Sequence, residues 1–341
     1  MTGADADAVQ HAHVERIAAL DTALAPQAEL RPDAGTWYGS VRADGSRGVG
    51  LATTTQVAED APAATFRALR EHRLRGRVAG PDVRGVLGEL LDRWGSEVQG
   101  ETARAAGGAP STDDVLAVTW PSRDVEAVAA LLDRGFRPTE VLAVRAERPE
   151  PRGGRARRPA EGVRVRDAGP QDVAVAAALQ LAELGYDALV GSARLRPATA
   201  RTVAGAIEHA IVRPGTTVLL AEIDGRPVGV VGVDHPGIAS EASRALAYDH
   251  VAYVVVLHVD ARARGRGVGR ALVDAALEAV RPDLGRDGGS TAASALHHGV
   301  LNPLSSPFWA RAGFRPALTS WERPTALPWA PVSAAHPRLV P

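Results

Sequence analysis

The stretch from Val254 to Leu272, VVVLHVDARARGRGVGRAL, decides the fold of the C-terminal half. Its opening run of Val and Leu is too continuous for a strand with one solvated face, so we expect residues 252–259 to form a strand buried on both faces. Glycines follow at 265, 267 and 269, and apolar residues at helical spacing then continue to Val280, before Pro282. The pattern predicts a buried strand, a glycine-rich turn and an amphipathic helix.

The predicted turn is suited to holding an anion. Glycine lets the backbone approach a ligand closely, and the first N–H groups of a helix, together with its dipole, favour a diphosphate. A dinucleotide-binding Rossmann turn is the alternative, but it requires GxGxxG early in the domain and an acidic residue after the next strand. Here the turn comes late, after a predicted hairpin, and its glycines are spaced differently. The spacing therefore favours another anion-binding fold.

The residues upstream of this turn alternate between helix and strand patterns. Apolar residues recur at helical spacing over Gln171–Leu184 and Thr199–Val212. Val218–Glu222 and Val228–Val233 flank Asp224-Gly225, a dipeptide that supplies the positive φ angles of a two-residue hairpin turn. A mixed α/β sheet follows from this order.

The N-terminal half repeats that order at a nearly constant offset. A second pattern of strand, Asp-Gly and strand lies within Trp37–Thr53. The segment Arg84–Asp92 corresponds to Arg266–Asp274, and Gly135–Pro138 corresponds to Gly313–Pro316. Three matches in the same order indicate a duplication. An unrelated α/β domain in the first half remains the alternative.

Composition sets the expected domain boundaries. The segment from Arg145 to Glu161, RAERPEPRGGRARRPAE, is rich in Pro, Gly and Arg and reads as a linker, and a second Pro-rich stretch closes the chain. We expect an N-terminal domain at 1–145, a linker at 146–161, a C-terminal domain at 162–325 and a tail at 326–341. Trp329 could pin part of that tail to a surface.

Charge and composition limit the partners. The net charge of the 341-residue chain is -1, which gives no indication of nucleic acid or of a membrane surface, so small molecules are the expected partners of a monomer or homodimer. The chain has no Cys, which excludes disulfides and thiolate chemistry. All its basic residues are Arg, as in a GC-rich bacterial genome. We see no signal-peptide layout and no run approaching about 20 apolar residues, and we expect a cytoplasmic protein.

The turn resembles the acyl-CoA-binding motif of the GNAT (Gcn5-related N-acetyltransferase) family, Q/R-x-x-G-x-G/A, at Arg264, Gly267 and Gly269. A second family signature starts at Asn302 and continues with Ser305, Trp309, Gly313 and Phe314. The resemblance implies an α/β fold of two tandem GNAT copies, each a mixed, mostly antiparallel sheet flanked by helices. A tandem layout with a degenerate first copy resembles that of mycothiol synthase in layout only.

In this family the turn holds the CoA diphosphate. The resemblance therefore implies an N-acyltransferase that moves an acetyl group from acetyl-CoA directly to the amine of a small molecule in a ternary complex. The cofactor-binding residues that it implies are Leu257, His258, Val259, Arg264, Gly265, Arg266, Gly267, Val268, Gly269, Arg270, Asn302, Ser305 and Trp309.

The sequence departs from the family at the two positions that serve acid–base chemistry. Val255 stands where some members carry a Glu base, and Trp309 stands where many carry a Tyr acid. The candidate catalytic residues are His258, Asp249 and Tyr253, and His258 could instead be a structural residue of the sheet. We expect no metal site, because the adjacent His297 and His298 of a strand point to opposite faces.

In the N-terminal half, Asp82 and Leu87 take the places of Arg264 and Gly269, and a carboxylate opposes a diphosphate. A degenerate copy that supports the second domain is expected. The acceptor would lie near Glu183–Leu189 and 239–250. Two alternatives remain: a catalytically inactive CoA-binding or interaction module, and an acetyltransferase for protein N-termini.

Overall fold

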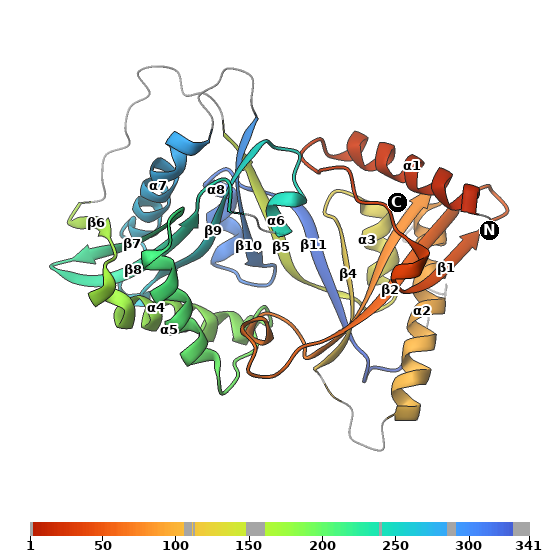
Figure 1. Cartoon of the computed structure of the whole chain (residues 1–341), viewed down its shortest axis with the longest axis horizontal. Coiled ribbons are helices and arrows are strands. Elements are labelled where there is room, and N and C mark those ends of the chain that lie inside the picture. The colour runs from red at the N-terminus through yellow and green to blue at the C-terminus, as the bar shows by residue number, and fades with distance from the viewer. Residues whose placement is uncertain are drawn as a thin grey trace, which may run out of the picture. The chain divides into compact units, whose positions relative to one another are not determined.

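The computed structural model describes residues 3–105, 111, 113–147, 161–238, 241–284 and 291–329. These residues form two compact units (Figure 1). Unit 1 contains the described residues of 1–58, 67–140 and 317–341, and unit 2 contains those of 59–66 and 141–316. Most of the expected linker and residues 330–341 of the expected tail lie outside the described residues.

Unit 1 is a five-stranded sheet with helices. Its strand order is β1 (Thr36–Val41), β2 (Arg47–Gln56), β3 (Arg70–Ala79), β4 (Asp114–Pro121) and β11 (Arg315–Pro324). Neighbours are antiparallel except β3 and β4. The helices are α1 (Gly3–Leu20), α2 (Val83–Ala105) and α3 (Val125–Leu132). The core lies between the sheet and α2 and α3, and it includes Trp94, Trp120 and Phe136.

Unit 2 is a six-stranded sheet with helices on both faces. Its strand order is β5 (Arg137–Ala146), β10 (Ala292–Gly299), β9 (His250–Val259), β8 (Arg226–Asp234), β7 (Thr216–Ile223) and β6 (Val163–Asp167). β9 and β10 are parallel, and the pairs β6–β7, β7–β8 and β8–β9 are antiparallel. The helices are α4 (Val173–Val190), α5 (Thr199–Val212), α6 (Glu241–Arg244), α7 (Val268–Val280) and α8 (Ser305–Arg311).

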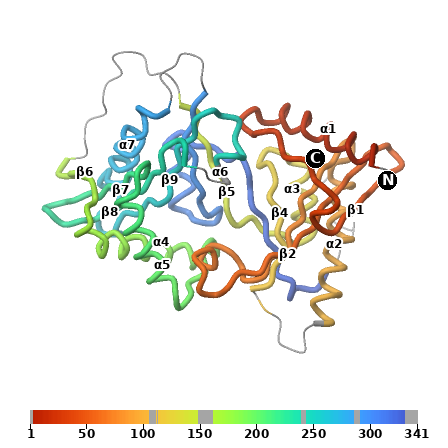
Figure 2. The backbone as a smooth tube through the Cα atoms, in the orientation of Figure 1, coloured from red at the N-terminus to blue at the C-terminus, as the bar shows by residue number. Residues whose placement is uncertain are grey.

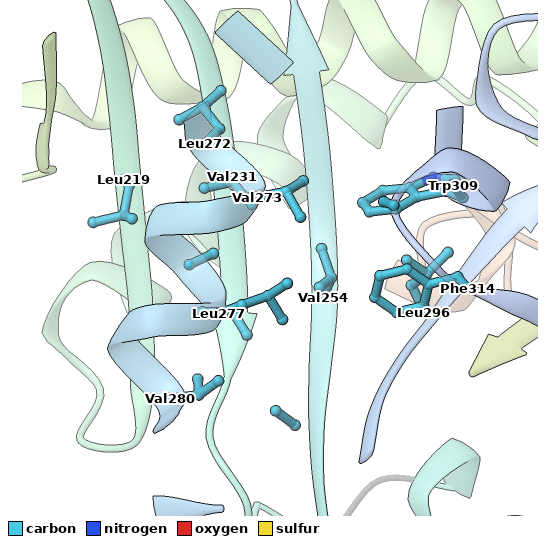
Figure 3. Packing of buried hydrophobic residues seen from close by; sticks show 14 of the residues in the cluster. Leu219, Val231, Val254, Leu272, Val273, Leu277, Val280, Leu296, Trp309 and Phe314 are labelled. Carbon is cyan, nitrogen blue, oxygen red and sulfur yellow. The ribbon is translucent and has the colours of Figure 1, made fainter. Parts of the chain in front are cut away.

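The two faces of the unit 2 sheet have separate cores. On one face, α7 packs its apolar stripe, with Leu272, Val273 and Leu277, against the strands (Figure 3). On the other face, α4 and α5 pack against β7, β8 and β9, where Val256 and Leu220 are buried. The continuous apolar run of β9 is therefore covered on both faces, as its composition predicts.

The last strand of each half belongs to the unit built mainly from the other half. β11, the last strand of the chain, pairs with β4 in unit 1, so the blue C-terminal segment lies beside β4 (Figure 2). β5, the last strand of the first half, lies next to β10 in unit 2. The predicted boundaries at 145 and 325 miss this exchange, because two similar terminal strands carry the same pattern and either could fill either place.

Helix α4 also differs from expectation. The segment Pro170–Val190 is the one helix among the described residues that is long and apolar enough to cross a membrane by length and composition alone. The prediction that no apolar run approaches the length of a membrane-spanning helix was therefore wrong for this segment. In the structure, Ala176, Leu179 and Leu184 of this helix are buried against the sheet of unit 2.

Trp329 is held against unit 1, as predicted. Its ring packs edge-on against Phe136 at 6.3 Å between centroids, and its indole N–H donates to Asp92 at 3.3 Å. Its backbone N–H donates to the Gln99 amide oxygen at 2.7 Å. The start of the Pro-rich tail is therefore part of the folded unit.

Candidate functional site

Unit 2 contains a cavity of about 1270 Å³ at the carboxyl end of β9. Its walls come from the end of β9, the turn that follows, the first residues of α7, one face of α4, and α8 with the loop before it. Every residue that the sequence predicted to bind the cofactor lies on this wall. These residues are Leu257, His258, Val259, Arg264, Gly265, Arg266, Gly267, Val268, Gly269, Arg270, Asn302, Ser305 and Trp309.

The glycine-rich turn presents its backbone to the cavity. Gly265 and Gly267 have φ angles of 75° and 80°, a region that residues with a Cβ rarely adopt. Gly267 is the N-cap of α7, and the first hydrogen bond of the helix runs from the Ala271 N–H to the Gly267 carbonyl. Among the described residues, the N–H groups of 265–270 have no protein acceptor. They are therefore available to an anion.

Gly269 is required for packing rather than for approach to a ligand. A Cβ at this position would lie 3.3 Å from the Phe308 ring of α8 and 3.5 Å from Val259. The small residue lets α7, α8 and the end of β9 meet at one wall of the cavity. The contacts with Phe308 and Val259 therefore favour a glycine at this position.

Arginine side chains surround the turn. Arg264 donates from Nε to the Val259 carbonyl at 3.1 Å and lies over the Tyr186 ring. Arg270 pairs with Asp274 one turn along α7 at 2.8 Å. Arg266 is exposed and makes no ion pair within the described part of the chain, and Arg311 adds a fourth guanidinium to the wall. The charge at this end of the cavity favours a multiply charged anion.

The strand beside the turn has an open edge. β9 pairs with β10 only as far as Val254 and Leu296, and the β8 pairing skips Val255 at a bulge. The Asp260 N–H donates to the Val228 carbonyl of β8, so by alternation the N–H groups of Leu257 and Val259 point away from β8, toward the edge that β10 has left. An extended ligand could lie along this edge.

His258 is the predicted catalytic candidate that the structure places on the cavity. It lies on the α4 face of β9, is 8% exposed and makes no hydrogen bond within the described residues. Burial, with the nearby charge of Arg264, lowers the pKa of His258 below its usual value. The imidazole is therefore neutral at pH 7.

Asp249 and Tyr253 do not line this cavity, and their catalytic roles stay predictions. The Asp249 carboxylate accepts from the Thr291 N–H and hydroxyl, at 2.8 and 3.0 Å. The Tyr253 hydroxyl hydrogen bonds with His297 Nδ1 at 2.7 Å. Both residues precede Leu257 on an extended strand that rises about 3.3 Å per residue, which separates them from the cavity wall by roughly 13 Å or more.

Asn302 has a structural role at the cavity wall. Its amide oxygen accepts from the N–H groups of Leu304 and Ser305, which begin α8, and its amide nitrogen donates to Asp187 at 2.9 Å. Trp309 is 6% exposed and packs between Phe308 and Phe314. These residues shape the wall. The amide group of Asn302 is occupied by hydrogen bonds within the protein.

Glu183 lines the cavity, and the sequence reading assigned it only to the acceptor region. Its carboxyl group lies near the Leu257 N–H, and Asp187 lies one turn along α4. Burial and the Asp187 charge raise the pKa of Glu183 well above its usual value. The signal available in the sequence was the spacing of two carboxylates by four residues in an otherwise apolar helix.

The equivalent turn of unit 1 is filled by the protein's own groups. The Asp82 carboxylate accepts from the Gly85 N–H at 2.7 Å, where α2 begins, and pairs with Arg42 at 3.0 Å. Arg42 also pairs with Glu89. A carboxylate thus occupies the helix N-terminus that an anion would need, in agreement with a degenerate copy.

We expect Asp82→Ala to destabilise unit 1 by about 1–2 kcal/mol, because it removes the cap of α2 and one partner of Arg42. Urea denaturation followed by circular dichroism measures the change in the free energy of unfolding. Arg84→Ala on the same helix is the control, since it removes only an exposed ion pair with Asp133, which follows α3, and should cost less than about 0.5 kcal/mol. Equal effects of the two substitutions would contradict the capping role of Asp82.

Within the part of the chain that the structure describes, no three His, Cys, Asp or Glu side chains are grouped as metal ligands. The expectation that the chain has no metal site stays a prediction.

Comparison with known proteins identifies the fold. Residues 194–314 match the sequence model of the acetyltransferase (GNAT) family. The structure is similar to that of a GCN5-related N-acetyltransferase from Sphaerobacter thermophilus, with a TM-score of 0.55 and 17% identity over 95% of this chain and 94% of that one. No curated protein sequence matches the chain.

Two further solved structures show weaker likeness. A tandem GNAT protein from the clavulanic acid biosynthesis pathway gives a TM-score of 0.42 and 17% identity over 94% of this chain and 96% of that one. An aminoglycoside N-acetyltransferase solved with CoA gives 0.36 and 14% identity over 46% of this chain and 89% of that one.

The fold and the site define an α/β protein whose strand-turn-helix element presents a helix N-terminus to a large cavity. Residues 194–314 are a GNAT acetyltransferase domain. The chain as a whole is two tandem GNAT folds that exchange their last strands, of which the first has a self-capped turn.

Proposed function

We propose that this protein is an acyl-CoA-dependent N-acyltransferase that uses acetyl-CoA to acetylate the amine of a small molecule. The observation that carries the proposal is the set of unpaired N–H groups at 265–270, which face a large cavity beside four Arg side chains. A diphosphate satisfies these donors, and the charge of the helix N-terminus adds to its binding. In unit 1, the same position already holds Asp82.

The shape of the cavity supports a thioester arm. With the diphosphate at the turn, an extended arm would run along the open edge of β9 past Val259 and Leu257. The Val259 N–H on this edge could then donate to the thioester carbonyl oxygen as negative charge develops on it. Direct attack by an amine held in the same cavity would complete the transfer.

Calorimetry with acetyl-CoA and a free-thiol assay with amines test this function. We expect about one equivalent of acetyl-CoA to bind to the full-length protein, because unit 2 offers an open turn and the turn of unit 1 is capped. Thiol release on addition of an amine is expected from an enzyme. Binding without release for any amine would support an inactive CoA-binding protein instead, and absence of binding would contradict the proposal.

A further inference from the structure

Glu183 projects from the middle of α4 into the cavity, opposite the end of β9. Its carboxyl group lies near the Leu257 N–H. Leu257 lies just beyond the bulge at Val255, where β9 carries an apolar side chain. A carboxyl group from α4 therefore lies beside a segment of β9 that carries no carboxyl group.

Leu257 lies on β9, a few residues before the glycine-rich turn. The turn begins at Arg264, and the open edge runs back from Val259 to Leu257, where the pairing of β9 with β10 has already ended. The reacting end of an arm anchored at the turn would lie along this edge. The Glu183 carboxyl group lies near the Leu257 N–H and lines the same cavity as this edge.

The charged groups around Glu183 are few. Asp187 on the same helix faces it, and Asp187 is itself held by Asn302 and faces His298 of β10. From β9, His258 lies on the same face, with its pKa lowered by burial and by Arg264. Burial and the Asp187 charge raise the pKa of Glu183 well above its usual value, which makes it a stronger base than an ordinary carboxylate.

We propose that Glu183 is the general base of this site and accepts the proton of the acceptor amine. The inference rests on the proposed function. As the bond forms between the amine nitrogen and the thioester carbonyl carbon, the nitrogen gives one proton to the Glu183 carboxylate. As the carbon–sulfur bond breaks, the sulfur leaves with the electron pair. The proton then passes from Glu183 through solvent to the thiolate, which restores the carboxylate.

The test compares Glu183→Gln with the wild-type protein. Glutamine keeps the size of the side chain and an oxygen near the Leu257 N–H, so we expect acetyl-CoA affinity, measured by calorimetry, to change less than about threefold. The rate of thiol release, measured with glucosamine, spermidine and alanine amide, should fall about 100-fold or more. In the wild type, kcat/KM should fall as the pH drops through the Glu183 pKa, and this acidic limb should be absent from Glu183→Gln.

Asp187→Asn is the matched variant, one turn along the same helix. Its oxygen still accepts from Asn302, but the negative charge that raises the pKa of Glu183 is gone. We expect turnover to persist and the acidic limb to move to lower pH, a shift that a structural role of Glu183 would not produce.

Several results would overturn the assignment while leaving the proposed function intact. They are wild-type turnover in Glu183→Gln, an increase in KM alone with the acidic limb unchanged, and loss of the limb in His258→Gln but not in Glu183→Gln. If the wild-type protein binds acetyl-CoA but releases no thiol with any of the three amines, the proposed transfer itself fails and the assignment fails with it.

Discussion

Replacing Gly267 by Val is expected to lower the affinity for acetyl-CoA at least about 100-fold, a loss of about 2.8 kcal/mol of binding free energy. Gly267 has a φ angle of 80°, and it is the N-cap that directs the first N–H groups of α7 into the cavity. A β-branched side chain disfavours this conformation and also covers the backbone that a diphosphate must approach. Calorimetric titration with acetyl-CoA measures the loss.

Backbone strain alone must be separated from loss of the site. Gly225 has a φ angle of 71° in the β7–β8 turn of the same unit, where a Cβ would meet nothing within 4 Å, and it does not line the cavity. Gly225→Val should therefore lower the melting temperature to a similar extent as Gly267→Val while it keeps wild-type affinity. If both variants bind acetyl-CoA equally well, the diphosphate does not lie at the turn.

Two glycines of α2 are expected to respond to alanine with opposite signs. Gly100→Ala should stabilise unit 1 by about 0.5–1 kcal/mol, because alanine favours a helix interior and the nearest atom to its Cβ would be 3.8 Å away. At Gly95, a Cβ would lie 2.4 Å from the Trp329 ring. Gly95→Ala should displace that ring and destabilise the protein by about 1–2 kcal/mol, since the lost packing outweighs the helix propensity.

Chemical denaturation of the two variants measures this difference in the free energy of unfolding. The displacement of Trp329 is checked in the Trp329→Ala background, where Gly95→Ala should become stabilising like Gly100→Ala. A destabilising Gly95→Ala in that background would mean that the helix rejects the side chain for a reason other than Trp329.

Much of the site could be predicted from one local stretch. The strand, the turn and the helix from Val254 to Val280 are contiguous, so their spacing in sequence is also their spacing in space. The predicted cofactor residues of this stretch line one cavity for this reason. Asp249 and Tyr253 do not line it, because nearness along an extended strand becomes distance in space.

The place of Glu183 beside β9 could not be predicted from the sequence, for the opposite reason. It is far from Leu257 along the chain, and only the packing of α4 on the sheet brings its carboxyl group to the Leu257 N–H. Its raised pKa comes from burial, which no local pattern reports. The sequence predicted that Val255 replaces the family's strand base. It did not indicate which other carboxyl group would lie at the cavity.

The sequence by itself determined the local elements: the buried strand, the glycine-rich turn, the duplicated order of elements and the carboxylate at Asp82 that opposes an anion. These depend on residue type and on short-range spacing. Only the tertiary structure decided which sheet receives β5 and β11, and which side chains meet at the cavity. Equivalent terminal strands satisfy the same hydrogen-bond pattern in either sheet, and a contact between distant residues depends on how whole elements pack.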